Sequence, residues 1–132
     1  MILVRVDGEP IPQGSKKAFV RGKRAVIVDD NAEKLKPWRA KIAAAADVGV
    51  TFDCPVAVFA VFYLTRPKKS RWGLPAVKPD SDKLTRALLD GLQDGGLLAQ
   101  DSRVVNSYVF KRYATDKNPP GVRVLITEAK DE

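Results

Sequence analysis

Along this chain, apolar residues alternate with polar residues within short runs, and turn-forming residues separate one run from the next. This pattern is typical of β-strands, because successive side chains of a strand point to opposite faces. Five such runs are expected to form strands: residues 2–6, 19–20, 25–28, 104–113 and 122–127. The second and third flank Arg21-Gly22-Lys23-Arg24, which predicts a short hairpin with a basic tip.

The run at residues 56–64 is apolar at nearly every position and not only at alternate ones. Such a run predicts a central strand that is covered on both faces. If a helix covers at least one of these faces, the fold is a layered arrangement of helices on a sheet.

Two segments carry apolar residues at helical spacing. In the first, Leu35, Trp38, Ile42 and Ala45 recur every three or four residues, and Trp38 is expected in the core. Because a proline removes a backbone donor and clashes with the preceding turn, the main helix is expected to begin at Pro37.

The second predicted helix spans residues 81–93. Leu84, Ala87, Leu88 and Leu92 form its apolar stripe, which is expected to face the core.

A chain of 132 residues is sufficient for one hydrophobic core, so we expect a single domain over residues 1–132.

Composition restricts the chemistry that is available. The formal net charge of +7 favours a polyanionic partner such as nucleic acid, although solubility alone explains it equally well. Cys54 is the only cysteine and histidine is absent, which excludes an intrachain disulfide, histidine-based zinc sites and Ser-His-Asp triads. The chemistry must therefore depend on carboxylates, Lys or Arg, hydroxyls, or metal-bound water.

Neither a membrane span nor a secretion signal is expected. The longest apolar run, residues 56–64, is too short to cross a bilayer, and the N-terminal residues lack a basic-then-apolar layout. A single cysteine fits a reducing compartment. We therefore expect a protein that acts in the cytoplasm and has no membrane partner.

An acidic motif organises the chain. Asp80 and Asp82 lie at the start of the second predicted helix, Arg86 follows within it, and Asp101 comes after the helix. Asp101 returns toward the pair only if the chain reverses, and Asp94-Gly95-Gly96 is typical of such a reversal. Three converging carboxylates repel one another unless a cation holds them, and all-oxygen ligation suits Mg2+ or Mn2+.

Two structural explanations compete with this metal site. Asp80, Ser81 and Asp82 are suited to capping a helix N-terminus, where the helix dipole favours negative charge. Arg86 lies four residues from both Asp82 and Asp90, so a helix-surface ion pair of about 0.3–0.5 kcal/mol explains it without catalysis.

Two basic loops are candidates for phosphate contacts. The first contains Lys16 and Lys17 after a glycine, and the second contains Lys68, Lys69 and Arg71, directly before the aspartate pair. The second loop also contains Trp72, an aromatic residue that fits stacking on an unpaired base. Solvated basic loops are the alternative explanation for both segments.

The runs at residues 79–86, 89–92 and 101–105 together resemble the signature of the RusA-type Holliday junction resolvases. The segment at residues 12–17 and the basic loop before the aspartates also resemble phage and prophage members of the family. The resemblance spans nearly the whole chain. It implies an α+β fold with a mixed sheet, two main helices and the order β-β-β-α-β-α-β-β.

The resemblance also implies roles for individual residues. Asp80, Asp82 and Asp101 match the metal-binding carboxylates of the family. Arg86 stands where the family usually has its catalytic lysine, and Lys83 stands where it usually has asparagine. An arginine keeps the positive charge but does not donate a proton near neutral pH. The roles of Arg86 and Lys83 are therefore open.

The resemblance implies an Mg2+- or Mn2+-dependent endodeoxyribonuclease that resolves four-way DNA junctions by paired nicks and acts as a homodimer in a bacterial host cell. Its catalytic residues would be Asp80, Asp82, Asp101 and Arg86, and its DNA-binding residues Lys16, Lys17, Lys68, Lys69, Arg71 and Lys83. Three alternatives remain: a nuclease for flaps or other branched DNA, a catalytically weak junction-binding protein, and a basic DNA-binding protein whose aspartates only cap a helix.

Overall fold

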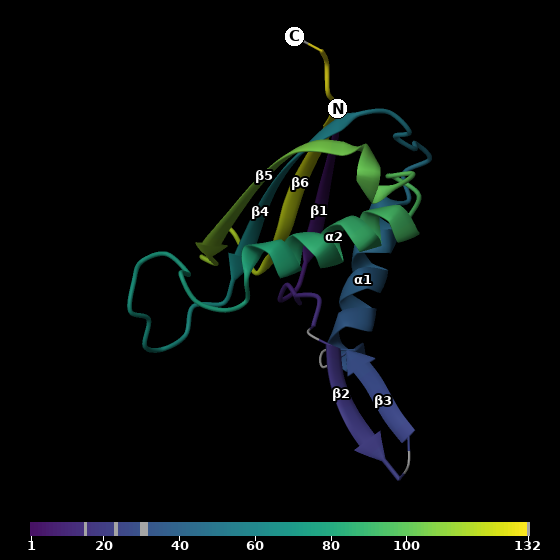
Figure 1. The fold of residues 1–132 in the computed structure, drawn as a ribbon. Coiled ribbons are helices and arrows are strands. Elements are labelled where there is room, and N and C mark those ends of the chain that lie inside the picture. The colour runs from purple at the N-terminus through teal and green to yellow at the C-terminus, as the bar shows by residue number, and fades with distance from the viewer. Residues whose placement is uncertain (15, 23, 30–31, 132) are drawn as a thin grey trace.

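A four-stranded sheet with two helices on one face forms the body of the molecule (Figure 1). The computed structural model describes residues 1–14, 16–22, 24–29 and 32–131, with the backbone alone described at 16–21 and 24–29. In chain order the elements are β1 (Ile2–Asp7), β2 (Lys16–Arg21), β3 (Arg24–Asp29), α1 (Ala32–Ala46), β4 (Val56–Leu64), α2 (Ser81–Asp94), the 3-10 turn η1 (Asp101–Arg103), β5 (Val104–Tyr113) and β6 (Gly121–Glu128). This order confirms the α+β fold expected from the sequence.

The main sheet has the strand order β1-β6-β4-β5 and is mixed. β6 pairs antiparallel with both β1 and β4, whereas β5 runs parallel to β4. Two parallel neighbours need a crossover connection, and α2 is part of that connection. The predicted central strand is confirmed, because β4 lies between β6 and β5.

β2 and β3 form a separate antiparallel hairpin, which extends away from the sheet and the helices (Figure 1). The backbone thus confirms the hairpin predicted from residues 19–28. Lys23 at its basic tip lies outside the described residues.

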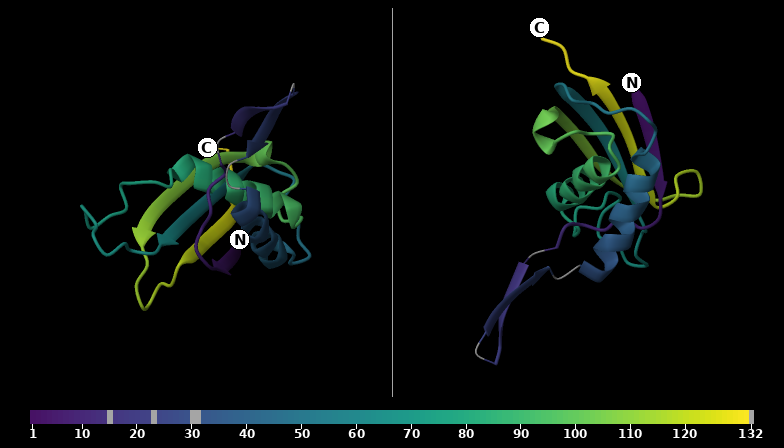
Figure 2. Two further views of the ribbon diagram at one scale, coloured as in Figure 1. Left: turned by 90° about the horizontal axis from the view of Figure 1, so that it is seen from below. Right: turned by 90° about the vertical axis from the view of Figure 1, so that its right-hand side faces the viewer.

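Both helices cover the same face of the sheet, and the opposite face has no helix or strand of the described chain over it (Figure 2). Val58, Ala60 and Phe62 of β4 are fully buried beneath the helices. Phe59 points to the other face and is 38% exposed. The expectation that β4 is covered on both faces is therefore wrong, because Phe59 is exposed on the outer face and Val61 and Tyr63 are only partly buried there.

The expected start of the first helix at Pro37 is also wrong. α1 begins at Ala32, and Pro37 is the sixth of its fifteen residues. A proline there removes one backbone hydrogen bond near the N-terminal end of the helix. The core position of Trp38 is confirmed, since Trp38 and Ile42 are at most 3% exposed. Their burial against the sheet and α2 offsets the missing bond.

α1 and α2 approach each other closely at two glycines of α2. A Cβ atom on Gly91 would lie 2.6 Å from Cγ2 of Ile42, and one on Gly95 would collide with the carbonyl oxygen of Ala43. The absence of side chains at these glycines therefore permits the contact. The predicted buried stripe of α2 is confirmed, because Leu84, Ala87, Leu88 and Leu92 are fully buried.

The chain reverses after α2 through a Schellman turn. Gly96 has a φ of 85°, its N–H donates to the carbonyl of Gln93 (3.1 Å), and Leu97 N–H donates to that of Leu92 (3.1 Å). Leu97 and Leu98 then enter the core. The predicted reversal at residues 94–96 is thus confirmed, and it turns the chain back toward Asp101.

No helix in the described part of the chain has the length and apolar character needed to cross a membrane.

Candidate functional site

The acidic pair lies at the first turn of α2. Asp80 is the N-cap residue, with extended backbone angles, and its carbonyl accepts the N–H of Leu84 (3.1 Å). Its carboxylate, however, makes no capping hydrogen bond. Asp80 and Asp82 are both exposed. Capping alone therefore does not account for the Asp80 side chain, which is free to face a ligand.

A lysine of β5 fixes the backbone directly before Asp80. Lys111 Nζ donates to the carbonyl oxygens of Val77 (2.7 Å) and Pro79 (2.8 Å). These charge-assisted bonds hold the end of the loop against the sheet. We did not predict a role for Lys111 from the sequence. The available signal was a charged residue at a strand position that shares its face with the partly buried Val109.

The N-terminal loop also reaches the acidic pair. Gln13 N–H donates to the carbonyl oxygen of Lys83 (3.0 Å), so residues 12–14 lie beside the first turn of α2. Lys83 is partly buried there. Lys16 and Lys17 follow as the first residues of β2, so the expectation that they lie in a loop is wrong. Their side chains lie outside the described part of the structure.

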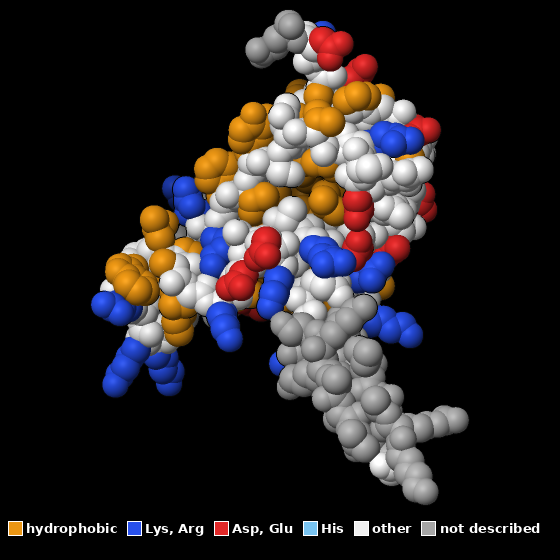
Figure 3. Space-filling view, in the orientation of Figure 1, with side chains coloured by type: hydrophobic (Ala, Val, Ile, Leu, Met, Phe, Trp, Pro, Cys, Tyr) orange, Lys and Arg blue, Asp and Glu red, His pale blue; other side chains and the backbone are white. Residues whose placement is uncertain are grey.

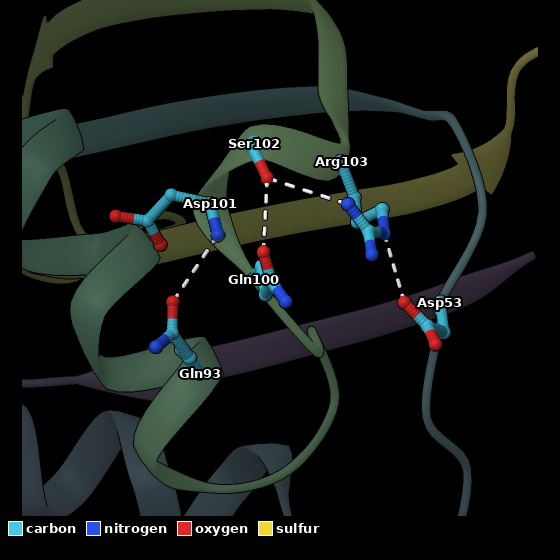
Figure 4. Close-up of polar contacts among 6 residues, drawn as sticks. All are labelled: Asp53, Gln93, Gln100, Asp101, Ser102 and Arg103. Atoms are coloured by element: carbon cyan, nitrogen blue, oxygen red, sulfur yellow. Dashed lines mark hydrogen bonds and ion pairs between the residues drawn. The ribbon is translucent and has the colours of Figure 1, made fainter.

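Asp101 lies beyond the far end of α2 and opens the turn η1. Its backbone N–H donates to Oε1 of Gln93 (3.1 Å), and its carboxylate points over α2 (Figure 4). Two residues later, Arg103 Nε donates to Oδ1 of Asp53 (2.8 Å). These contacts tie η1 to α2 on one side and to the loop before β4 on the other.

The electrostatics of Asp101 identify its neighbours. Asp101 is an exposed residue whose carboxyl is partly buried; this partial burial is the largest cause that raises its pKa, and repulsion from Asp90 and a hydrogen bond with Asp90 raise the pKa further. The positive charges of Arg86 and Arg39 oppose this rise. Asp101 therefore lies near both Asp90 and Arg86. Sequence reasoning considered Asp90 only as an ion-pair partner of Arg86 and did not consider Arg39 at all.

Asp82, Arg86 and Asp90 follow one another at intervals of four residues and so share one side of α2. Eight residues of helix correspond to about 12 Å along the axis. The acidic residues thus form one set at Asp80 and Asp82 and another at Asp90 and Asp101, with Arg86 between them. In Figure 3, acidic and basic side chains alternate over α2.

Among the described residues, no three Asp, Glu or Cys side chains lie close enough together to hold one metal ion. The shared ion of Asp80, Asp82 and Asp101 therefore stays a prediction. The donor chemistry fits such an ion, because carboxylate oxygens suit Mg2+ and Mn2+. Burial and the negative charge of Asp90 raise the pKa of Asp101, and a cation near its carboxylate would offset both effects.

Arg86 is exposed, and the helix-surface ion pair that was the alternative explanation for it is absent among the described residues. The ion pairs in the described part of the chain are Arg5–Asp7, Arg39–Asp94 and Arg103–Asp53. The guanidinium of Arg86 thus stands between two acidic sets without a carboxylate at contact distance. It is suited to contact a phosphate in the same place.

The basic loop before Asp80 projects beyond the end of β4, and its tip carries blue and orange side chains (Figures 1 and 3). Lys68, Lys69 and Arg71 are all exposed. The guanidinium of Arg71 lies 4.5 Å from the ring centroid of Trp72, which is 45% exposed. An exposed ring among cations on a projecting loop is suited to contact bases and phosphates together.

Comparison with protein families gives one finding that bears on this geometry. The family model described as "Endodeoxyribonuclease RusA" matches residues 7–127 of the 132 residues. The matched range includes the acidic residues at both ends of α2, Arg86 and both basic segments. The search of curated proteins gives no match.

Proposed function

Since the chain belongs to the RusA family of endodeoxyribonucleases, which hydrolyse DNA and resolve Holliday junctions, we propose that it is a divalent-metal-dependent enzyme that resolves four-way junctions by paired symmetric nicks. The observation that carries this proposal is the Asp80 carboxylate. It is exposed, it makes no capping bond, and it stands between an anchored loop end and the first turn of α2.

In this proposal Asp80, Asp82 and Asp101 hold Mg2+ or Mn2+. A bound ion of this kind supplies a Lewis acid that lowers the pKa of a water molecule and stabilises charge on the reacting phosphate. Ligation of one ion by all three carboxylates requires their oxygens to lie closer together than in this structure.

Arg86 lies between the two acidic sets and would stabilise the negative charge that develops on the phosphate. A guanidinium stays protonated near neutral pH, so Arg86 would act as a charge clamp and not as a proton donor. Lys83, beside the aspartate pair, would add positive charge for a neighbouring phosphate.

The basic loop before Asp80 and the start of β2 would position the DNA strand. Lys68, Lys69 and Arg71 are exposed on the loop that leads to Asp80, and Lys16 and Lys17 begin the hairpin that follows the N-terminal loop. Contacts of this kind set register and orientation without reading sequence. Trp72 would stack on a base at the branch point, where pairing is interrupted.

A homodimer is part of the proposal, because a four-way junction is close to twofold symmetric and resolution needs two matched nicks. One active site of this size does not reach both strands, whereas a C2 dimer presents two sites through one interface. The DNA substrate and the single cysteine favour the cytoplasm of a bacterial host cell as the place of action.

The test compares a labelled four-way junction with a linear duplex of matched sequence, each with Mg2+, Mn2+ or EDTA. Paired symmetric nicks confined to the junction, and abolished by EDTA, are the expected result. Asp82→Asn should abolish nicking and leave junction binding intact or tighter, since a carboxylate repels phosphate. Asp116→Asn, in the exposed turn after β5, is the matched control and should nick normally. Normal nicking by Asp82→Asn would show that the carboxylate assignment is wrong.

A second candidate has a specific observation in its favour. Arg86 occupies the position at which the family usually has a lysine, and this departure fits a protein that binds junctions and cuts them poorly. Junction retention in a gel without nicks, at any concentration of Mg2+ or Mn2+, would identify that activity.

A further inference from the structure

The uncovered face of the main sheet carries a continuous row of apolar side chains. Strand register places Leu3 opposite Leu125, Leu125 opposite Phe59, and Phe59 opposite Tyr108. The row therefore crosses all four strands from one edge to the other. Leu3, Phe59 and Tyr108 are substantially exposed, at 70%, 38% and 47%. An exposed apolar row of this extent is typical of an interaction surface.

Aromatic rings dominate the β5 end of this face. Phe59 and Tyr108 are stacked, with centroids 4.7 Å apart and an interplanar angle of 9°. Phe110 lies two residues beyond Tyr108, shares its face and is 45% exposed. The guanidinium of Arg112 is 5.4 Å from the centroid of the Phe110 ring. The surface thus offers flat rings with cations beside them.

The stack of Phe59 and Tyr108 ends at the edge of the sheet. One side of the Tyr108 ring contacts Phe59, and β5 is the last strand in the sheet order, so no further strand of the described chain lies on the other side. The separation of the two centroids is close to the spacing of neighbouring strands, about 4.8 Å. A planar group would extend this stack by one more step beyond the edge.

The charges of this face select among possible partners. Strand alternation places Arg5, Arg112 and Arg123 on it, and Asp7 is the one acidic residue that the described strands place there. Asp7 is already paired with Arg5 at 3.0 Å. The face therefore has a net positive charge, and a second copy of it would bring arginines against arginines.

We propose that the open face of the β1-β6-β4-β5 sheet binds single-stranded DNA, with bases stacked on Tyr108 and Phe110 and phosphates held by Arg112 and Arg123. Unpaired bases supply the flat groups that the rings need, and the sugar-phosphate backbone supplies the negative charge. A base pair inside a duplex does not expose its flat face, so the proposal predicts a preference for single strands.

This surface is distinct from the candidate site, whose carboxylates (Asp80, Asp82 and Asp101) lie on or beside α2, over the opposite face of the sheet (Figure 2). The proposal does not depend on cleavage, because stacking and phosphate contact require no metal. Binding of single-stranded DNA can therefore be measured in EDTA. A negative result there would contradict this proposal and would leave the nuclease assignment unaffected.

The test measures fluorescence anisotropy of a fluorescein-labelled twenty-nucleotide oligo-dT and of a labelled twenty-base-pair duplex, in EDTA. Loss of one stacking ring weakens binding about tenfold, so the double variant Tyr108→Ser/Phe110→Ser should raise the Kd for oligo-dT at least tenfold and change duplex binding little. Leu3→Ser removes an exposed apolar side chain from the same row without removing a ring. Its Kd should stay within about twofold of the unchanged protein.

Tyr108→Trp keeps an aromatic ring at this position, so it is not expected to destabilise the fold as the double serine variant could. Its tryptophan fluorescence provides a second measurement of binding. This variant should bind oligo-dT at least as tightly as the unchanged protein, and the oligonucleotide should quench its tryptophan fluorescence more strongly. Equal Kd values for the double serine variant and the unchanged protein would overturn the proposal, and so would the absence of added quenching. A double variant that loses self-association in sedimentation equilibrium, with its oligo-dT affinity unchanged, would assign the face to a second copy of the chain instead.

Discussion

The ammonium nitrogen of Lys111 lies 2.8 Å from the carbonyl oxygen of Pro79, so a strand residue holds the backbone that immediately precedes Asp80. A second bond from the same nitrogen, to Val77, reinforces this anchor. The position of the acidic pair thus depends on β5, although more than twenty residues separate them in the sequence. Lys111 does not need to touch DNA to affect cleavage.

Lys111→Met should therefore slow junction cleavage about tenfold to a hundredfold, because a small displacement of a catalytic carboxylate is costly. The measurement is single-turnover cleavage at saturating protein, together with junction affinity. We expect the rate to fall and the affinity to change little, whereas a phosphate-contacting lysine would change the affinity. Lys117→Met, in the exposed turn after β5, is the matched control and should cleave at the normal rate.

Arg86→Lys distinguishes two possible roles of the residue at this position of α2, a fixed positive charge and a proton donor. If Arg86 acts only as a charge clamp, the substitution should slow cleavage severalfold, because lysine lacks the bidentate geometry of arginine. The rate should then stay flat across the pH range in which the lysine remains protonated. Faster cleavage by the variant would indicate that this position needs a compact cation or a proton donor.

Asp101 should make stability depend on pH. Its pKa in the folded chain is raised above the ordinary value of 3.8, chiefly by burial, so ionisation disfavours the folded state. Below the unfolded pKa the carboxyl is neutral in both states and the penalty is absent. The penalty grows as the pH rises from 3.8 through the folded pKa. Asp101→Asn should thus raise the Tm at pH 7 in EDTA.

At acid pH, below the unfolded pKa, the Tm values of Asp101→Asn and the unchanged protein should converge. Thermal unfolding followed by circular dichroism across this pH range measures both limits. A constant difference at all pH values would instead indicate an effect of packing or of hydrogen bonding. Asp116→Asn again serves as the control, with no expected change in Tm.

Gly91→Ala tests the contact between α1 and α2. The added methyl group would lie 2.6 Å from Cγ2 of Ile42, so the helices must separate, at a cost of about 1–3 kcal/mol in the free energy of unfolding. Gly73→Ala meets no atom within 4 Å and should change that free energy by no more than about 0.5 kcal/mol. Urea unfolding midpoints measure both effects.

Local patterns in the sequence were sufficient for most of the fold. The apolar stripe of α2 and the double glycine after it predicted a helix and a reversal, because hydrophobic periodicity and a positive φ are local requirements. The predicted start of α1 at Pro37 was wrong, because the burial of Trp38 and Ile42 stabilises the helix by more than the one hydrogen bond that the proline removes. The uncovered side of β4 was missed because an apolar side chain is compatible with both burial and an exposed surface.

The sequence by itself determined that Asp80, Asp82 and Arg86 share the start of a helix and that the chain returns after it, because helix geometry and turn chemistry act over a few residues. Only the tertiary structure decided that Asp101 lies beside Asp90 and Arg86, that Lys111 holds Pro79, and that Phe59 stacks on Tyr108 across an open face. Those relationships join strands and helices far apart in the chain, and only the packing of the whole domain fixes them.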